Sequence, residues 1–431
     1  MIDNFRHIHF IGIGGSGISA LAWLALSHGI KVSGSDMAEN PTIRNLRAEG
    51  AEIFVDHRAE NLNEMAELVI YTEAIDRENN PEFLAAEKTG VRRLSYFQAL
   101  GEMSAHKKTI VVTGTHGKTT TTAMLGQALI KAGLDPTVIV GSGVRAFEGK
   151  NIHVGHSQWM VVEGCEYRRS FLSFKPFGMI VLNCELEHVD YYKNEDDYVL
   201  AFGELAGKLP EDGFLIYNAK DENCQKINAV AKCKGIAVKD TDGIRLSIPG
   251  DFNKLNAAHA RAAALEIGAE KGKVESGLAE FSGTARRMEI KGETRPEQGE
   301  EKGITVIDDY GHHPTEVRAT LSALKEKYPE SRLICVFQPH QYSRTHQLIG
   351  DFKTAFGDAD EVIIPNIFEA RDTAEDKAKI SAEKLAGEIP GARFGDGFEK
   401  TVSWLRQNTR PGDIVVTMGA GDVYKVGEAF L

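Results

Sequence analysis

A short glycine-containing loop near residue 115 has the residue types that bind nucleotide phosphates. It follows an apolar stretch at 109–113 and opens a segment of helical periodicity at 119–132. In such a loop backbone N–H groups surround phosphate oxygens, a lysine reaches the β and γ oxygens, and a hydroxyl can ligate Mg²⁺. The spacing is GxxGK[ST], two residues shorter than the usual P-loop. Against a solvated lysine in an ordinary turn, we predict ATP binding by Gly114, Thr115, His116, Gly117, Lys118, Thr119 and Thr120.

A second glycine loop lies near the start of the chain. Gly12, Gly14 and Gly17 satisfy GxGxxG between a predicted strand at 7–13 and a predicted helix at 17–28. Glycines there allow a tight turn and let a diphosphate approach the N–H groups at the helix start. Asp36 ends the next predicted strand, where an acid can bind a ribose hydroxyl. These residues alone leave open an NAD-dependent dehydrogenase, a UDP-sugar-binding protein and a turn without a ligand.

Alternating strands and helices must position both loops. Apolar segments at 30–34, 51–55 and 67–71 continue the first pattern, which restarts at 109–113 and again after a polar stretch at 291–303, a linker or hairpin tip. Later strands are predicted at 137–141, 158–163, 178–183, 304–308, 332–337, 360–365 and 413–418. Such alternation is typical of parallel, doubly wound α/β sheets. We therefore predict an α/β protein with three domains at 1–105, 106–290 and 291–431.

The composition is ordinary for a soluble globular protein. The 431 residues are 42% hydrophobic and 26% charged, which suits about three globular domains. A net charge of −12 disfavours a nucleic-acid partner. The five cysteines are odd in number and form no CxxC pair, which disfavours a disulfide framework or a zinc site. Because no signal-peptide pattern or spanning apolar run is present, we expect a cytoplasmic protein without membrane insertion.

Eight ordered pieces, spread essentially from end to end, resemble the Mur ligase family, and within it the alanine-adding branch. The stretch EYRRSFL is similar to the form found in Gram-positive bacteria. The pieces are HFIGIGGSGISALA (9–22), VSGSD (32–36), TGTHGKTTTT (113–122), EGCEYRRSFLSFKP (163–176), ARRMEIKGE (285–293), DDYGHHPTEV (308–317), FQPHQYSRT (337–345) and GAGD (419–422).

The resemblance implies a reaction in peptidoglycan biosynthesis. ATP would phosphorylate the lactyl carboxylate of UDP-N-acetylmuramic acid, and L-alanine would attack the acyl phosphate to give the amide, ADP and phosphate. It implies a Rossmann-like N-terminal domain that binds the UDP-sugar, a central P-loop ATPase-type domain and a Rossmann-like C-terminal domain. The first loop is thereby reassigned from NAD to the UDP-sugar, through Gly12, Gly14, Gly15, Ser16, Gly17 and Asp36.

The resemblance also implies roles for single residues. Glu163 and His188, with Thr119, would bind Mg²⁺, and Glu166 ranks below Glu163 as a ligand. No lysine near Arg168 is placed for the carbamylation used elsewhere in the family, and Lys175 is not assigned. Catalytic roles fall to Lys118, Glu163, His188 and Arg287.

Further residues are implied around the nucleotide and the amine. Asn253 and Asn256, at the start of a helix, would lie near the base, with helix capping by Asn253 as the alternative; Phe252 stands where members often have His. Arg287 would neutralise phosphate or carboxylate charge and Asp309 would contact the nucleotide. The cleft for the sugar carboxylate and alanine would hold Tyr310, His313, His340 and Arg344, with Gln341 where some relatives have Arg.

Three alternatives differ in class or substrate. A recycling ligase would attach a tripeptide to the same UDP-sugar, but EYRRSFL and the compact C-terminal part favour alanine. A dehydrogenase has no use for the second glycine loop. A silent regulator would not need Lys118, Thr119, Glu163, His188 and Arg287 together. We expect a monomer or homodimer.

Overall fold

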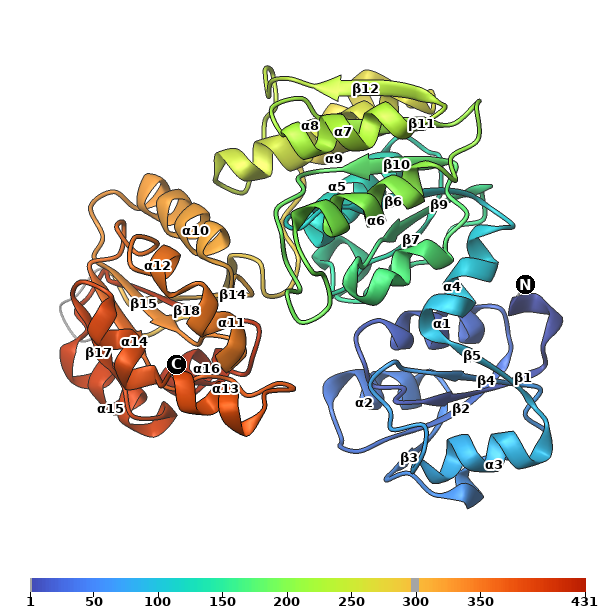
Figure 1. Cartoon of the computed structure of the whole chain (residues 1–431), viewed down its shortest axis with the longest axis horizontal. Coiled ribbons are helices and arrows are strands. Elements are labelled where there is room, and N and C mark those ends of the chain that lie inside the picture. Colours follow the sequence, from blue (N-terminus) through green and yellow to red (C-terminus); the bar gives the residue numbers. More distant parts are fainter. Residues whose placement is uncertain (1, 296–301) are drawn as a thin grey trace. The chain divides into compact units, whose positions relative to one another are not determined.

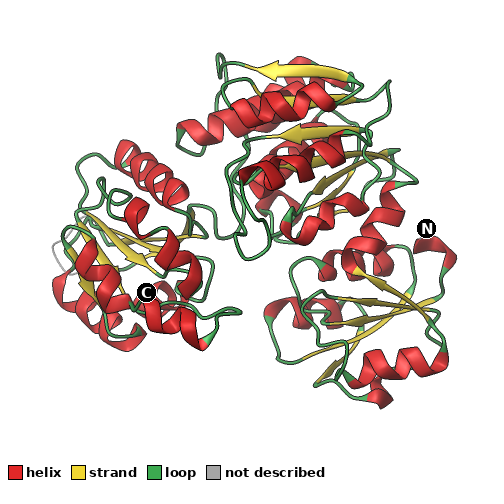
Figure 2. Cartoon of the chain, viewed as in Figure 1, coloured by secondary structure: helices red, strands yellow, loops and turns green. Residues whose placement is uncertain are grey.

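The computed structural model describes residues 2–295 and 302–431, and it separates into two compact units. One unit comprises residues 2–246 and 255–282, and the other comprises 247–254 and the described residues from 283 onward. Figure 1 follows the chain through both units, and Figure 2 shows helices alternating with strands along it. Residues 296–301 of the predicted polar stretch lie outside the described residues.

The first sheet is fully parallel and carries the first glycine loop. Its neighbouring side chains alternate between two cores: Ile8 and Phe10 pack in one with α1, whereas Ile11 packs in the other with Ala86 of α3. This is the pattern of a parallel sheet covered on both faces. The strands, in spatial order, are β3 (Glu52–Val55), β2 (Lys31–Asp36), β1 (His7–Ile11), β4 (Leu68–Tyr71) and β5 (Arg92–Ser95), and the helices are α1 (Ile18–Ser27), α2 (Pro41–Ala48), α3 (Pro81–Thr89) and α4 (Tyr96–Ser104).

The second sheet belongs to the same unit and carries the second glycine loop. Its strands pair in parallel except for β8, which runs antiparallel to β7 at one edge. The spatial order is β12 (Lys234–Val238), β11 (Phe214–Asn218), β10 (Gly178–Val181), β6 (Lys108–Thr113), β9 (Trp159–Glu163), β7 (Thr137–Ile139) and β8 (Ile152–His153); the α-helices of this part are α5 (Lys118–Lys131), α6 (Glu195–Ala206), α7 (Glu222–Val230), α8 (Asp251–Glu266) and α9 (Lys271–Ala279).

The third sheet forms the core of the other unit. Ile307 and Phe337 pack on one face with α10, whereas Val306 and Val336 pack on the opposite face with α15 and α16. The order is β13 (Glu289–Glu293), β14 (Thr305–Asp309), β18 (Ile414–Met418), β15 (Leu333–Phe337), β16 (Glu361–Ile364) and β17 (Ala392–Phe394). Among the described strands β13 pairs antiparallel with β14, and the other pairs are parallel. The α-helices are α10 (Pro314–Lys327), α11 (Tyr342–Gln347), α12 (Ile349–Phe352), α13 (Ala374–Lys379), α14 (Ala382–Glu388), α15 (Phe398–Asn408) and α16 (Tyr424–Phe430).

The predicted α/β class and parallel sheets are confirmed, and the predicted strands agree with the structure within a few residues at each end. Asn253 and Asn256 lie near the start of a helix as predicted, because α8 begins at Asp251. Part of the polar stretch after 290 belongs to β13, one arm of a hairpin with β14. The domain boundaries near 105 and 290 stay a prediction. Among the described residues no helix combines the length and apolarity needed to cross a bilayer.

Candidate active site

The loop between β6 and α5 has a backbone that requires glycine at two positions. Gly114 and Gly117 have φ angles of 136° and 84°, in the left-handed region. A Cβ at Gly117 would lie 2.5 Å from Oδ1 of Asn256, and one at Gly114 would lie 3.0 Å from the Cβ of Leu182. The loop therefore ends a central strand and opens a helix N-terminus, as the sequence predicts for a phosphate-binding loop.

Lys118, the first residue of α5, folds back over this loop. Its Nζ donates hydrogen bonds to the carbonyl oxygens of Gly114 (2.6 Å) and Thr115 (2.9 Å) and to Oε1 of Glu166 (3.0 Å). Burial alone would lower the pKa of Lys118, but the charge of Glu166 outweighs it and the pKa is raised. The ammonium group is thus kept charged and held at the mouth of the loop.

Glu166 connects this lysine to His188. The Glu166 side chain is buried, and its Oε1 lies 3.5 Å from Nε2 of His188. Burial opposes ionisation, yet Lys118 and then His188 hold the pKa of Glu166 below its usual value. Within the described chain, Oε2 of Glu166 and Nδ1 of His188 are buried without hydrogen-bond partners. Buried orphan atoms of this kind can serve a ligand or an ion.

Thr119 and Glu163 form a cluster of side-chain oxygens beside the loop. The Thr119 hydroxyl donates to Oε1 of Glu163 at 2.9 Å, and the backbone N–H of Gly141 donates to Oε2 at 2.8 Å. Glu163 is the last residue of β9, which pairs in parallel with β6, so both residues lie at the same carboxyl edge of the sheet. Hydroxyl and carboxylate oxygens are ligands that suit Mg²⁺.

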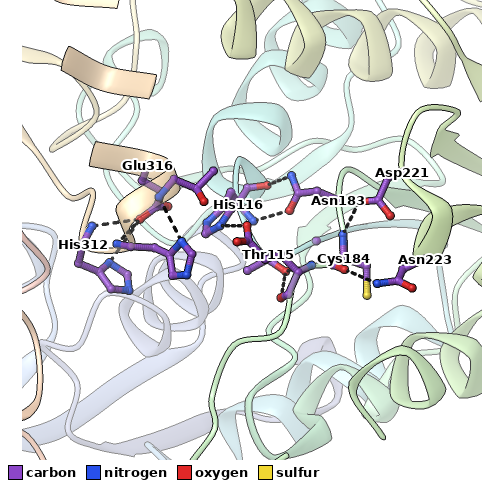
Figure 3. Close-up of polar contacts among 12 residues, drawn as sticks. Thr115, His116, Asn183, Cys184, Asp221, Asn223, His312 and Glu316 are labelled. Atoms are coloured by element: carbon purple, nitrogen blue, oxygen red, sulfur yellow. Dashed lines mark hydrogen bonds and ion pairs between the residues drawn. The ribbon is translucent and has the colours of Figure 1, made fainter. Parts of the chain in front are cut away.

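The opposite wall of the loop is fixed by Asn183, which follows β10. Its amide oxygen accepts the backbone N–H of His116 at 2.8 Å, and its amide nitrogen donates to the His116 carbonyl at 3.1 Å. The Thr115 hydroxyl donates to the Glu185 carbonyl at 2.7 Å. Figure 3 shows Thr115, His116 and Asn183, with Cys184 to one side of them, where its backbone is hydrogen-bonded to the side chains of Asp221 and Asn223. The loop is therefore held in shape by its neighbour strand.

The turn after Glu166 has a strained backbone that could not be predicted from the sequence. Arg168 and Arg169 both have left-handed backbones, with φ angles of 52° and 57°, which side chains disfavour. Arg169 is anchored to α6 through Glu204 and through Asp197 at 2.6 Å. This anchor holds the segment that carries Glu166. In the sequence, the one feature that marks this turn is the pair of arginines close to Glu166.

In the first glycine loop, the backbone contacts the side chain of Asp36. The N–H of Gly14 donates to Oδ2 of Asp36 at 2.8 Å, and Gly12 takes a left-handed φ of 80° where a Cβ would lie 2.5 Å from Thr72. Gly12, Gly15 and Asp36 line one pocket of about 580 Å³, whereas Ser16 lines a neighbouring one. The structure thus brings Asp36 to the loop as predicted, although one of its oxygens is already used by Gly14.

In the other unit, Arg287 and Asp309 lie near one another. Nη1 of Arg287 is 3.6 Å from Oε1 of Glu316, and its guanidinium lies 5.1 Å from the ring centre of Tyr310. Asp309 accepts the N–H groups of Met288 (2.8 Å) and Gly311 (2.7 Å). Burial raises the pKa of Asp309 to about 6, against the opposing charge of Arg287.

The remaining predicted residues of this unit have structural partners. His313 caps α10 in a capping box with Glu316, and the ring of His340 stacks on Phe368 at 5.4 Å. Arg344, on α11, is buried. Gln341, at the position where some relatives have Arg, is buried, and its side-chain amide donates to the Ala370 carbonyl at 2.9 Å. It therefore acts as a scaffold for the turn before α11.

The predicted pair Asn253 and Asn256 divides between two environments. Asn256 lies against Gly117 of the phosphate loop. Asn253 is in the first turn of α8 and donates to the Pro249 carbonyl at 2.6 Å. Phe252 packs on Gly250, where an added Cβ would lie 2.7 Å from its ring. Of the two, Asn256 is the one that lies beside the phosphate loop in the same unit.

Three models of one family match successive parts of the chain. They are described as Mur ligase family, catalytic domain (residues 7–108), Mur ligase middle domain (112–242) and Mur ligase, glutamate ligase domain (286–421).

Curated proteins and solved structures agree with these matches over the full length. UDP-N-acetylmuramate–L-alanine ligases of Clostridium acetobutylicum and Clostridium novyi are 39% and 38% identical, covering 100% of this chain and 98% of each relative. The crystal structure of UDP-N-acetylmuramate–alanine ligase from Thermotoga maritima is similar with a TM-score of 0.81 and 29% identity, covering 98% of both chains. A murein peptide ligase from Psychrobacter arcticus shares the fold, with a TM-score of 0.73 at 23% identity, 99% of this chain and 98% of that one.

Proposed function

This chain belongs to the Mur ligase family, and we propose that it joins L-alanine to UDP-N-acetylmuramate with ATP as the energy source. The substrates follow from the full-length relatives, which carry that name. The structural observation that supports the proposal most strongly is the phosphate loop, where Lys118, Glu166 and His188 adjoin Thr119 and Glu163. This arrangement offers one cation and several oxygen ligands at a helix N-terminus.

The chemistry needs positive charge around crowded anions. The lactyl carboxylate attacks the γ-phosphorus of ATP, ADP leaves, and the resulting acyl phosphate is attacked at its carbonyl carbon by the amine of L-alanine. The tetrahedral intermediate loses a proton from nitrogen and expels phosphate to leave the amide. Lys118 stabilises the charge that develops on the β and γ oxygens, and the N–H groups at the start of α5 bind the phosphates.

The oxygen cluster fits Mg²⁺. Thr119 and Glu163 would hold the ion on oxygen ligands, and the unpartnered Nδ1 of His188 and Oε2 of Glu166 offer further donor atoms. When bound, Mg²⁺ supplies charge neutralisation for the triphosphate. Glu166 pairs with both Lys118 and His188, so we propose that it is as important to the site as Glu163. Its task is to orient those two side chains.

The other substrates are assigned by unit. The first glycine loop, from Gly12 to Gly17, binds the diphosphate of the UDP-sugar, and Asp36 shapes that loop and contacts the ribose. Asn256 contacts the nucleotide beside Gly117, with Asn253 in the adjoining turn. We assign Arg287 and Asp309 to nucleotide binding, and Tyr310, His313, His340 and Arg344 to the cleft for the sugar carboxylate and alanine. We place the enzyme in the cytoplasm, as a monomer or homodimer, in peptidoglycan synthesis.

The test supplies purified protein with ATP, Mg²⁺ and UDP-N-acetylmuramic acid, and adds one amine at a time. Phosphate release and product mass are followed together. The proposal expects L-alanine-dependent phosphate release and a UDP-sugar heavier by one alanyl residue. Turnover only with the tripeptide L-alanyl-D-glutamyl-diaminopimelate would assign the chain to recycling instead. Phosphate release that no amine increases would contradict ligation.

A further inference from the structure

The pocket beside the first glycine loop has three carboxylates and one histidine on its walls. It encloses about 580 Å³, and its lining includes Asp36, Asp56, Asp76 and His57 next to Gly12 and Gly15 of the loop. Among the described residues that line it, His57 alone has a side chain that can become positively charged. The other charged side chains on the lining are all carboxylates, which would repel a diphosphate placed at this loop.

A buried hydrogen-bond relay fixes the orientation of that histidine. Nδ1 of His57 lies 2.8 Å from Oγ of Ser35, and the Ser35 hydroxyl donates to Oε2 of Glu82. Because a serine has a single hydroxyl proton, Ser35 must accept from Nδ1 of His57. Nδ1 therefore carries a proton, and Nε2 is the ring nitrogen available to a ligand.

Several neighbouring groups hold the carboxylate of Glu82 in place. It is fully buried and accepts from Nδ2 of Asn61 at 2.6 Å and from the backbone N–H of Arg58 at 3.2 Å, and Nε2 of His9 lies 3.2 Å away. Burial favours the neutral acid, but the contacts with His57, His9 and Ser35 outweigh it and lower the pKa of Glu82 to about 2. The carboxylate is thus ionised at every physiological pH.

The groups facing His57 are mostly acidic. Glu82, 3.8 Å from Nδ1, raises the pKa of His57; burial opposes this, and Asp36 and Asp56 reinforce it. Arg58, the neighbouring cation, is paired with Asp56 at 3.4 Å. A neutral imidazole would offer Nε2 only as an acceptor, whereas an imidazolium offers it as a charged donor.

We propose that His57 binds the diphosphate of the UDP-sugar through Nε2, with Ser35 and Glu82 as the residues that position it. The inference rests on the proposed function, because it assumes that a nucleoside diphosphate sugar occupies this pocket. It adds a charged donor to the backbone N–H groups that the loop offers to phosphate.

Calorimetric titration with UDP-N-acetylmuramic acid from pH 5.5 to 8.5 tests the inference, because its diphosphate diester does not titrate in that range. The parent should bind about tenfold or more weakly at high pH than at low pH. His57→Asn keeps an amide nitrogen near the Nδ1 position but removes Nε2; it should bind about tenfold more weakly at low pH and lose the pH dependence. Ser35→Ala should shift the midpoint of the pH dependence to lower pH. The control is His28→Gln at an exposed histidine, and this variant should bind as the parent does.

Two results would overturn the inference. If His57→Asn is folded by circular dichroism and binds like the parent at every pH, His57 makes no contact with the diphosphate. If the parent binds with no pH dependence while Ser35→Ala changes nothing, the relay has no role. A parent that binds no UDP-N-acetylmuramic acid at all would overturn the proposed function together with the inference, and so is distinguishable from both.

Discussion

The Nζ of Lys118 lies 3.0 Å from Oε1 of Glu166, and both side chains are shielded from water, with 15% and 2% of their surfaces exposed. The lysine that should serve ATP is therefore neutralised by a partner inside the protein. Breaking a buried pair by removing one partner leaves an uncompensated charge, which costs far more than the pair itself contributes. Catalysis and stability are thus coupled at this loop.

Replacing Lys118 with Ala should affect both properties. We expect ligation to fall at least about a hundredfold because a charge-stabilising group is lost. We also expect the free energy of unfolding to fall by about 3 kcal/mol, because the buried Glu166 carboxylate loses its lysine partner and keeps only the longer contact with His188. Urea denaturation and phosphate release measure the two effects. The double variant Lys118→Met, Glu166→Gln should regain much of the stability and none of the activity; a variant Lys118→Ala with near-parent turnover would refute the assigned role.

Glu163→Gln should weaken the affinity for Mg²⁺ and leave the fold intact. The amide retains one oxygen near Thr119 but loses the negative charge, so the Mg²⁺ concentration for half-maximal turnover should rise about tenfold or more. Titration of activity with MgCl₂ measures this, and exposed Glu211→Gln serves as the control. An unchanged Mg²⁺ dependence in Glu163→Gln would remove Glu163 from the metal site.

Two glycines allow a matched test of the loop. Gly117 and Gly133 have nearly the same φ, 84° and 82°, but only Gly117 lacks room for a Cβ, because Asn256 would be 2.5 Å away. Gly133→Ala should cost about 1 kcal/mol of backbone strain and leave turnover intact. Gly117→Ala should add displacement of the loop and raise the KM for ATP at least tenfold. Equal kinetics in the two variants would show that the contact with Asn256 does not matter.

Glu82 should make the protein sensitive to acid. Its pKa is about 2 in the folded state against an ordinary 4.5, so its stabilising effect is complete above about pH 4.5 and is lost as pH falls toward 2. The difference corresponds to about 3 kcal/mol. Denaturation of the parent and of Glu82→Gln from pH 6 to 3 measures it: the gap in unfolding free energy should narrow at low pH. A constant gap would show that ionisation of Glu82 is not the cause.

Much of the fold follows from local pattern. Buried parallel strands such as β4 and β15 are continuous apolar runs, and the two glycine loops mark where α1 and α5 begin, so those elements could be predicted from the sequence. Edge strands carry less signal. The two-residue strand β8 and the polar strand β13 are set by pairing with β7 and β14 rather than by their own residues.

The site was predicted only in part. Lys118, Thr119 and Glu163 could be found because spacing and strand position determine where they lie. The contacts of Glu166 with Lys118 and His188 had no such signal, because they depend on how a segment with left-handed residues at Arg168 and Arg169 folds. No spacing rule describes such a turn. The relay from Glu82 to His57 joins residues from separate elements and has no local signature.

The central claim, ATP-driven ligation through an acyl phosphate, is tested most directly by oxygen transfer. UDP-N-acetylmuramic acid with ¹⁸O in its lactyl carboxylate is incubated with ATP, Mg²⁺, L-alanine and the enzyme, and product and phosphate are analysed by mass spectrometry. Our account predicts a UDP-sugar heavier by one alanyl residue and one ¹⁸O atom in each phosphate released. Phosphate without ¹⁸O, alongside the same amide product, would contradict attack of the carboxylate on the γ-phosphorus.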